Sequence, residues 1–183
     1  MTTAALVLAA GLSSRFGPQN KLLAPVAGRP LARITAEAVK AAAPDHLLAV
    51  LSDPELAPAF SGFQTLRNDT PERGQAGSLR IGVAAAQRLN CDFLLVLLAD
   101  MPRVSPALIQ AVEARATPHL AAATTDGDRR MPPACFPASD FAALMKLDGD
   151  RGAGRLINAL PPSQLVRADA DTLFDIDTHE DEQ

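Results

Sequence analysis

The chain has 183 residues, 48% of them hydrophobic, and a formal net charge of −4 at pH 7. This length and apolar content predict one globular domain with a sizeable core and exclude a disordered chain. The negative charge argues against nucleic acid as the main partner, because a duplex is bound through a basic face.

Strand and helix patterns alternate along the first half of the chain. Strands are expected at residues 4–9, 47–51, 63–66 and 93–98. Helices are expected at 30–42 and at 78–89, whereas the connector 53–62 has at most a short helix. The first helix is expected to bury Leu31, Ile34, Ala38 and Ala41. Six consecutive apolar residues at 93–98 are typical of a central strand in a parallel sheet.

The second half continues the alternation with shorter elements. Helices are expected at 106–116 and 139–147, with Ser105 and Ser139 as their caps, and at 152–160. Strands are expected at 120–125, 131–136, 165–167 and 173–176, with a turn at 126–128. Repeated strand–helix–strand units predict an α/β fold with a mostly parallel sheet and helices on both faces. One domain is expected over 1–178, followed by an acidic tail at 179–183.

The sequence shows no sign of membrane insertion or export. No apolar run reaches the roughly 18 residues of a membrane span, and Arg15 ends the first apolar stretch early. No basic segment precedes that stretch, as a secretory signal would require. Cys91 and Cys135 lack metal-ligand spacing and are expected to be buried thiols. We therefore expect a cytoplasmic protein without a membrane partner.

A glycine-containing loop follows the first strand. It contains Gly11, Arg15 and Gly17 and leads to Lys21. Glycines let backbone N–H groups approach an anion, and both cations suit phosphate oxygens. Neither a Walker A loop nor a dinucleotide fingerprint fits this spacing. Polyphosphate binding is the favoured hypothesis, and an ordinary strand–loop–helix turn with two solvated cations is the alternative.

Acidic residues lie at or just beyond the ends of two of the predicted strands. Asp100 comes after 93–98, and Asp175 and Asp177 alternate with apolar residues near the C-terminus. Carboxylates beside a phosphate loop are suitable ligands for Mg²⁺. The alternatives are a turn cap for Asp100 and a solvated chain end for the other two. Because ligands bind at the carboxyl ends of such strands, the loops 10–21 and 99–103 are expected to share one cleft.

The segment from Leu8 to Gly17 with the following Lys21-Leu22-Leu23 resembles the MobA-like nucleotidyltransferases, which include the molybdenum cofactor cytidylyl- and guanylyltransferases. Leu98-Ala99-Asp100-Met101-Pro102 is similar to the family's metal-binding motif, and residues 175–178 are similar to its C-terminal acidic motif. The resemblance implies a Rossmann-like three-layer domain. It also implies Arg15, Lys21 and Asp100 as catalytic residues, and Mg²⁺ held by Asp100, Asp175 and Asp177.

The resemblance extends to two further segments. Residues 68–80 match the cytidylyltransferase branch at Gly74, Ser78 and Arg80, and residues 148–155 resemble its second glycine loop. Without the family, the first is a loop before a helix and the second a plain helix–helix turn. The implied nucleotide-binding residues are Leu8, Ala9, Ala10, Gly11, Ser13, Ser14, Arg15, Lys21, Asn68, Ser78 and Arg80. The implied acceptor-binding residues are Pro133, Asp150, Arg151 and Arg155.

The resemblance implies transfer of a nucleotide from a nucleoside triphosphate to a phosphorylated acceptor, with release of pyrophosphate. Asn20-Lys21 resembles the cytidylyl branch, which favours CTP over GTP as the nucleotide donor. The same resemblance implies molybdopterin as the acceptor and transient contact with a molybdenum enzyme. One alternative is a sugar-phosphate or other small-molecule nucleotidyltransferase. Another is a non-catalytic nucleotide-binding accessory protein for molybdenum enzyme maturation.

Overall fold

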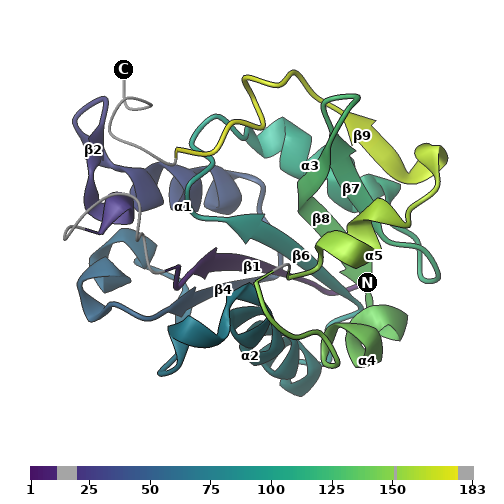
Figure 1. Ribbon diagram of the computed structural model, residues 1–183, viewed down its shortest axis with the longest axis horizontal. Coiled ribbons are helices and arrows are strands. Elements are labelled where there is room, and N and C mark those ends of the chain that lie inside the picture. Colours follow the sequence, from purple (N-terminus) through teal and green to yellow (C-terminus); the bar gives the residue numbers. More distant parts are fainter. Residues whose placement is uncertain (12–19, 151, 177–183) are drawn as a thin grey trace.

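A seven-stranded sheet forms the centre of the computed structural model, which describes residues 1–11, 20–150 and 152–176 (Figure 1). The strand order is β5-β4-β1-β6-β8-β7-β9. Their bounds are β1 Thr3–Ala9, β4 His46–Leu51, β5 Gln64–Arg67, β6 Phe93–Leu98, β7 Ala122–Thr125, β8 Arg130–Pro137 and β9 Leu165–Arg167. Within this sheet β8 runs antiparallel to both neighbours, and every other neighbouring pair is parallel. The mostly parallel α/β sheet is therefore confirmed.

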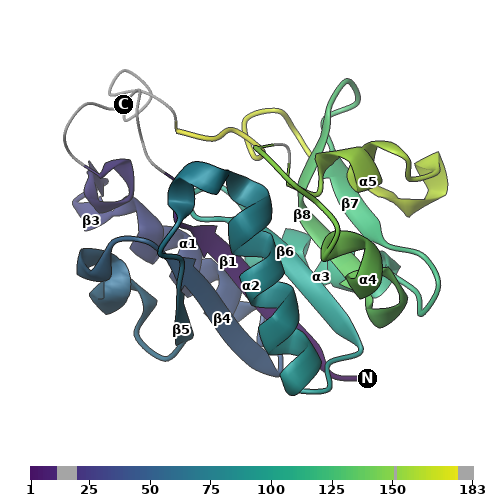
Figure 2. The ribbon, with the colours of Figure 1, turned by 60° about the horizontal axis from the view of Figure 1, so that its bottom comes forward.

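Helices cover both faces of the sheet, as Figures 1 and 2 show. The helices α1 (Leu31–Ala41) and α3 (Pro106–Arg115) pack into one core, and α2 (Gln75–Arg88), α4 (Phe141–Leu144) and α5 (Gly154–Asn158) pack into the other. Side chains of β1 alternate between the two cores, with Val7 on the α1 side and Leu6 on the α2 side. This alternation follows from the two-residue period of a strand. No helix of the described chain is long and apolar enough to span a membrane.

Short elements connect this framework. The strands β2 (Pro25–Val26) and β3 (Arg29–Pro30) form an antiparallel hairpin, which was not predicted. The 3-10 helices are η1 Lys21–Leu23, η2 Pro54–Phe60, η3 Pro71–Arg73, η4 Ala138–Asp140 and η5 Pro162–Gln164.

The chain reverses its direction of winding beside β1. From β1 it passes through α1 to β4 and then β5, and it returns through α2 to β6 on the other side of β1. The connections after β1 and β6 therefore lead to opposite sides along the sheet, toward β4 and toward β7, although α1 and α3 pack into the same core. In open α/β sheets such a switch point opens a crevice at the carboxyl ends of the strands. Lys21 and Asp100 follow these two strands in the chain and are therefore the first residues to consider at this crevice.

The buried face of α1 differs from the prediction. The structure buries Leu31, Ala32, Thr35, Ala36 and Val39, whereas Ala41 is exposed and Ile34 and Ala38 are partly buried. The prediction placed only apolar residues on the inner face. Thr35 can lie there because its hydroxyl finds a carbonyl partner on another element, which removes the cost of burying it.

One predicted helix start and one predicted helix cap are wrong. Helix α2 begins at Gln75 rather than Ser78, because Gly74 adopts φ +82° and the Gly149 carbonyl accepts the Ala76 N–H. Ser78 therefore lies inside the helix. The predicted helix 139–147 shortens to η4 and α4, and the Ser139 hydroxyl donates to the Pro118 carbonyl instead of capping.

The predicted strand at 173–176 is also wrong. Leu173 and Ile176 are buried in the core on the α1 side, which explains the strand-like alternation of the sequence. The segment does not join the sheet but reaches the loop after β6, where the Ile176 N–H donates to the Asp100 carbonyl at 3.1 Å. In Figure 1 this yellow segment runs from beside β9 toward α1.

Candidate active site

Lys21 and Asp100 meet at the carboxyl ends of the central strands. Lys21 begins η1, which the Asn20 side chain caps by accepting the Leu22 N–H at 3.1 Å. Asp100 lies two residues beyond β6. The Lys21 Nζ lies 2.7 Å from Asp100 Oδ2 and donates to the Ile176 carbonyl at 3.0 Å. Three distant segments of the chain thus converge on one ammonium group, and the ends of the two predicted loops come together as expected.

Asp100 has an unusual electrostatic environment. Burial raises the pKa of its carboxyl above the ordinary range, the Lys21 charge opposes that increase, and the Asp175 charge adds to it. Among the described residues, no group donates a hydrogen bond to the buried Asp100 Oδ1. A buried carboxylate oxygen without a donor is costly to keep in a folded protein. Asp100 therefore has the properties of a group that awaits a cation.

Hydrogen bonds to its backbone hold the Asp100 loop from two sides. The Ala99 N–H continues the ladder to the Leu8 carbonyl at 3.1 Å, and the Ala99 carbonyl accepts the Thr35 hydroxyl at 3.0 Å. The Ile176 N–H binds the Asp100 carbonyl. Sequence reasoning missed Thr35, although a polar residue four positions from both Leu31 and Val39 was a usable signal.

The remaining predicted residues of the first loop are only partly described. Leu8, Ala9 and Ala10 are buried at the end of β1, and Gly11 is exposed. The residues Ser13, Ser14, Arg15, Arg151 and Asp177 lie outside the described part of the chain. Asp175 is described, partly buried, and close enough for its charge to act on Asp100.

Asn68 and Ser78 are brought together, but their polar groups bind each other. The Asn68 amide donates to Ser78 Oγ at 2.9 Å, and both residues are buried. Asn68 Oδ1 accepts the Thr70 N–H at 2.9 Å. These contacts hold the loop that leads into α2, so the two side chains support its backbone.

The second glycine loop packs against the start of α2. Arg80 donates to the Leu147 carbonyl, and its guanidinium lies 3.8 Å from the Asp148 carboxylate. A Cβ placed on Gly74 would lie 2.3 Å from Asp150 Oδ1, so only glycine allows this close approach. The structure therefore joins the two segments that the resemblance treats as nucleotide and acceptor contacts. Of the other predicted acceptor residues, Pro133 is buried in β8 and Arg155 is exposed on α5.

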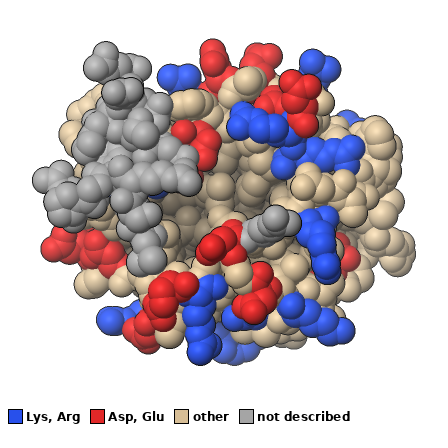
Figure 3. All heavy atoms as spheres, viewed as in Figure 1, with Lys and Arg blue, Asp and Glu red and all other residues tan. Residues whose placement is uncertain are grey.

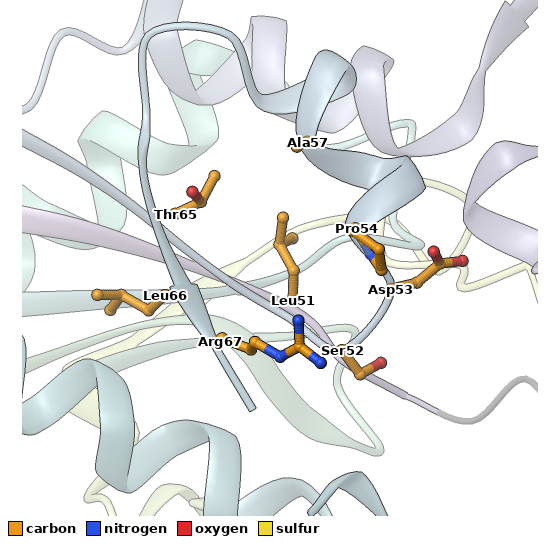
Figure 4. A pocket seen from close by; sticks show the side chains of 8 residues that line it. All are labelled: Leu51, Ser52, Asp53, Pro54, Ala57, Thr65, Leu66 and Arg67. Atoms are coloured by element: carbon orange, nitrogen blue, oxygen red, sulfur yellow. The ribbon is translucent and has the colours of Figure 1, made fainter. Parts of the chain in front are cut away.

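A mostly apolar pocket of about 170 Å³ lies between the end of β4, η2 and β5 and was not predicted. Figure 4 shows its walls, which come from the end of β4, the start of η2 and β5. Asp53 belongs to this lining, and its carboxylate accepts the Asn20 amide at 2.9 Å. The pocket is thereby connected to the element that carries Lys21. Figure 3 shows a hollow on the face seen in Figure 1, with acidic and basic side chains around it.

Known proteins share both the sequence pattern and the fold. The MobA-like NTP transferase domain matches residues 5–165. The purine catabolism protein PucB of Bacillus subtilis is 32% identical, over 95% of this chain and 91% of that protein. A probable molybdenum cofactor guanylyltransferase of Natronomonas pharaonis is 30% identical, over 64% of this chain and 58% of that protein.

Solved structures agree with the fold. The crystal structure of Rv0371c from Mycobacterium tuberculosis H37Rv superposes with a TM-score of 0.85 at 27% identity, over 99% of this chain and 95% of that chain. A structure of Rv0371c in complex with manganese superposes with a TM-score of 0.80 at 24% identity, over 99% and 96% of the two chains.

Proposed function

The chain belongs to the family of MobA-like NTP transferase domains, and we propose that it transfers CMP from CTP to a phosphorylated acceptor such as molybdopterin. Its class, nucleotidyltransferase, follows from the family. The convergence of Lys21, Asp100 and the 173–176 segment at the carboxyl ends of β1 and β6 carries the proposal. A cation and two carboxylates at this point suit a triphosphate with its divalent metal.

The carboxylates fit a divalent cation. Asp100 Oδ1 is buried without a donor among the described residues, and the charge of Asp175 acts on the same carboxylate. Mg²⁺ prefers oxygen ligands, and in proteins it is usually bound by one or two carboxylates together with substrate phosphates. We assign Asp100 and Asp175 as its ligands, with Asp177 as the alternative second ligand. When bound, the ion would neutralise triphosphate charge and polarise the reacting phosphoryl group.

The chain itself contributes position and charge. An oxygen of the acceptor phosphate attacks the α-phosphorus in line, the bond to the bridging oxygen breaks, and pyrophosphate leaves. The acceptor phosphate is already an anionic nucleophile, so no protein nucleophile is needed. Lys21 supplies positive charge beside Asp100, and the glycine loop with Arg15 is assigned to the β- and γ-phosphates. Catalysis then consists of alignment and charge neutralisation.

The choice of base and acceptor rests on resemblance. Asn20-Lys21 and Ser78-Leu79-Arg80 are similar to the cytidylyl branch, which favours CTP. The relative from Natronomonas pharaonis is named for molybdenum cofactor guanylyl transfer, which supports molybdopterin as acceptor and keeps GTP as the alternative donor. Transient contact with a molybdenum enzyme would deliver the product. Cys91 and Cys135 are buried free thiols, compatible with the reducing cytoplasm that we propose as location.

A pyrophosphate-release panel tests the proposal. Each of CTP, GTP, ATP and UTP is assayed with Mg²⁺ against molybdopterin and against sugar phosphates. We expect turnover with CTP and molybdopterin, and a loss of about 100-fold or more in Lys21→Met and Asp100→Asn. The exposed residues Lys146 and Asp128 offer matched controls, since Lys146→Met and Asp128→Asn remove the same charges away from the site.

Each other outcome contradicts a stated part. Faster release with GTP contradicts the CTP assignment, and release with sugar phosphates alone contradicts the acceptor. Binding of a nucleotide without any release would identify an accessory protein instead of an enzyme.

A further inference from the structure

A buried hydroxyl lies directly beside the loop that carries Asp100. Thr35 belongs to α1 and is 2% exposed. Its Oγ1 donates to the Ala99 carbonyl at 3.0 Å, across a sequence separation of 64 residues. The contact therefore joins a helix on one face of the sheet to the peptide that immediately precedes the proposed metal ligand.

A threonine is unusual at this buried position of α1. Thr35 occupies the inner stripe of α1 between Leu31 and Val39, where an apolar side chain would pack at no polar cost. A buried hydroxyl without a partner is destabilising, and a helical threonine usually satisfies itself on the carbonyl one turn earlier. Here it reaches a carbonyl on another element. The contact therefore constrains the backbone next to Asp100 and not only the helix itself.

The hydrogen bond from Thr35 restricts the orientation of Asp100. The Ala99 carbonyl and the Asp100 N–H belong to one planar peptide unit, so a bond to the carbonyl restricts the rotation that sets the direction of the next side chain. On the other side of Asp100, its carbonyl accepts the Ile176 N–H. Lys21 holds Oδ2. Within the described chain these contacts leave Oδ1 as the carboxylate atom without a hydrogen-bond partner.

We propose that Thr35 is a positioning residue for metal binding: its hydroxyl fixes the Ala99–Asp100 peptide so that Asp100 presents its unpartnered Oδ1 to a divalent cation. The inference rests on the proposed function. Thr35 touches neither substrate nor metal and acts through the Ala99 carbonyl. Outer-shell partners of metal ligands commonly change metal affinity by about 10- to 100-fold when they are lost.

The test measures binding of Mn²⁺ directly, by electron paramagnetic resonance, in the presence of CTP and without acceptor. Thr35→Val removes the hydroxyl and keeps the volume, and Thr35→Ser keeps the hydroxyl. Thr35→Ala replaces the valine variant if that one does not fold. Thr124→Val is the matched control, because Thr124 is 0% exposed and its hydroxyl donates to the Met131 carbonyl at 2.8 Å, on strands away from Asp100.

We expect the Kd of Mn²⁺ to rise about tenfold in Thr35→Val. Thr35→Ser should stay within about twofold of the wild type, and Thr124→Val should lower the thermal midpoint without changing the Kd. An unchanged Kd in Thr35→Val, or an equal rise in Thr124→Val, overturns the inference while leaving the proposed function intact. If the wild type binds no Mn²⁺ with CTP, or if Asp100→Asn binds it equally well, the proposed metal site itself is wrong.

Discussion

The Lys21 ammonium lies 2.7 Å from the Asp100 carboxylate, although 79 residues separate them in the chain. Both side chains are mostly buried, with 13% and 18% of their surfaces exposed. Two opposite charges in such an environment stabilise each other, whereas either alone is costly to bury. The pair is therefore expected to stabilise the folded protein in addition to its proposed role in catalysis.

A double-mutant cycle measures this coupling. We expect Lys21→Met to lower the free energy of unfolding more in the wild type than in Asp100→Asn, by about 0.5–3 kcal/mol. The reason is that the amide of the Asp100→Asn variant carries no charge for the missing ammonium to leave uncompensated. Urea unfolding of the four proteins, without nucleotide or metal, provides the values. Equal effects of Lys21→Met in the two backgrounds would show that the pair contributes no coupling.

Two glycines of α2 should respond oppositely to alanine. A Cβ on Gly82 would lie 2.1 Å from Leu6 Cδ2 on β1, whereas a Cβ on Gly77 would meet nothing nearer than 3.8 Å. Gly82→Ala should therefore destabilise the protein by about 1–3 kcal/mol through overpacking. Gly77→Ala should be neutral or stabilising by up to about 1 kcal/mol, because alanine favours helix. Thermal and urea unfolding distinguish them, and equal responses would mean that α2 does not approach β1 as described.

The Asn68–Ser78 contact should contribute measurably to stability. Ser78→Ala leaves the buried Asn68 amide without its acceptor, at an expected cost of about 1–3 kcal/mol. Ser139→Ala removes an exposed hydroxyl bond and should change the free energy of unfolding by less than about 0.5 kcal/mol. Urea unfolding compares the two variants. A Ser78→Ala protein as stable as Ser139→Ala would contradict the buried pairing.

Asp126 gives the hairpin between β7 and β8 a pH-dependent stability. Its carboxylate accepts the N–H groups of Arg129 and Asp128, and these bonds hold its pKa below the ordinary value. The unfolded state therefore binds the proton more readily than the folded state. The resulting stabilisation is present above the unfolded pKa of about 3.9 and is lost as the pH falls through the lower, folded-state pKa.

The measurement compares the wild type with Asp126→Ala in urea across this pH range. The wild type should be the more stable protein at neutral pH, and the difference should shrink on acidification. Asp128→Ala controls for the change in net charge, because Asp128 is exposed in the same turn. A difference that is constant with pH would rule out the carboxylate as its source.

The sequence by itself determined the layered α/β fold and the two residues, Lys21 and Asp100, that meet at the candidate site. Apolar runs and their periods depend on residues near one another in the chain, so 93–98 could be recognised as a central strand and Lys21 and Asp100 could be placed at strand ends. The rule that ligands bind at the carboxyl ends of such strands then brought the loops together. The resemblance supplied the family, which the match over residues 5–165 confirms.

Only the tertiary structure decided which groups satisfy one another. The Thr35 hydroxyl finds Ala99 over 64 residues, and Lys21 finds the Ile176 carbonyl over 155. Such contacts depend on which face of a helix turns inward and where a terminal segment crosses the core. Local pattern leaves both open, because many packings bury the same apolar residues. The competition of buried polar groups for partners selects one of them, and that selection is a property of the whole chain.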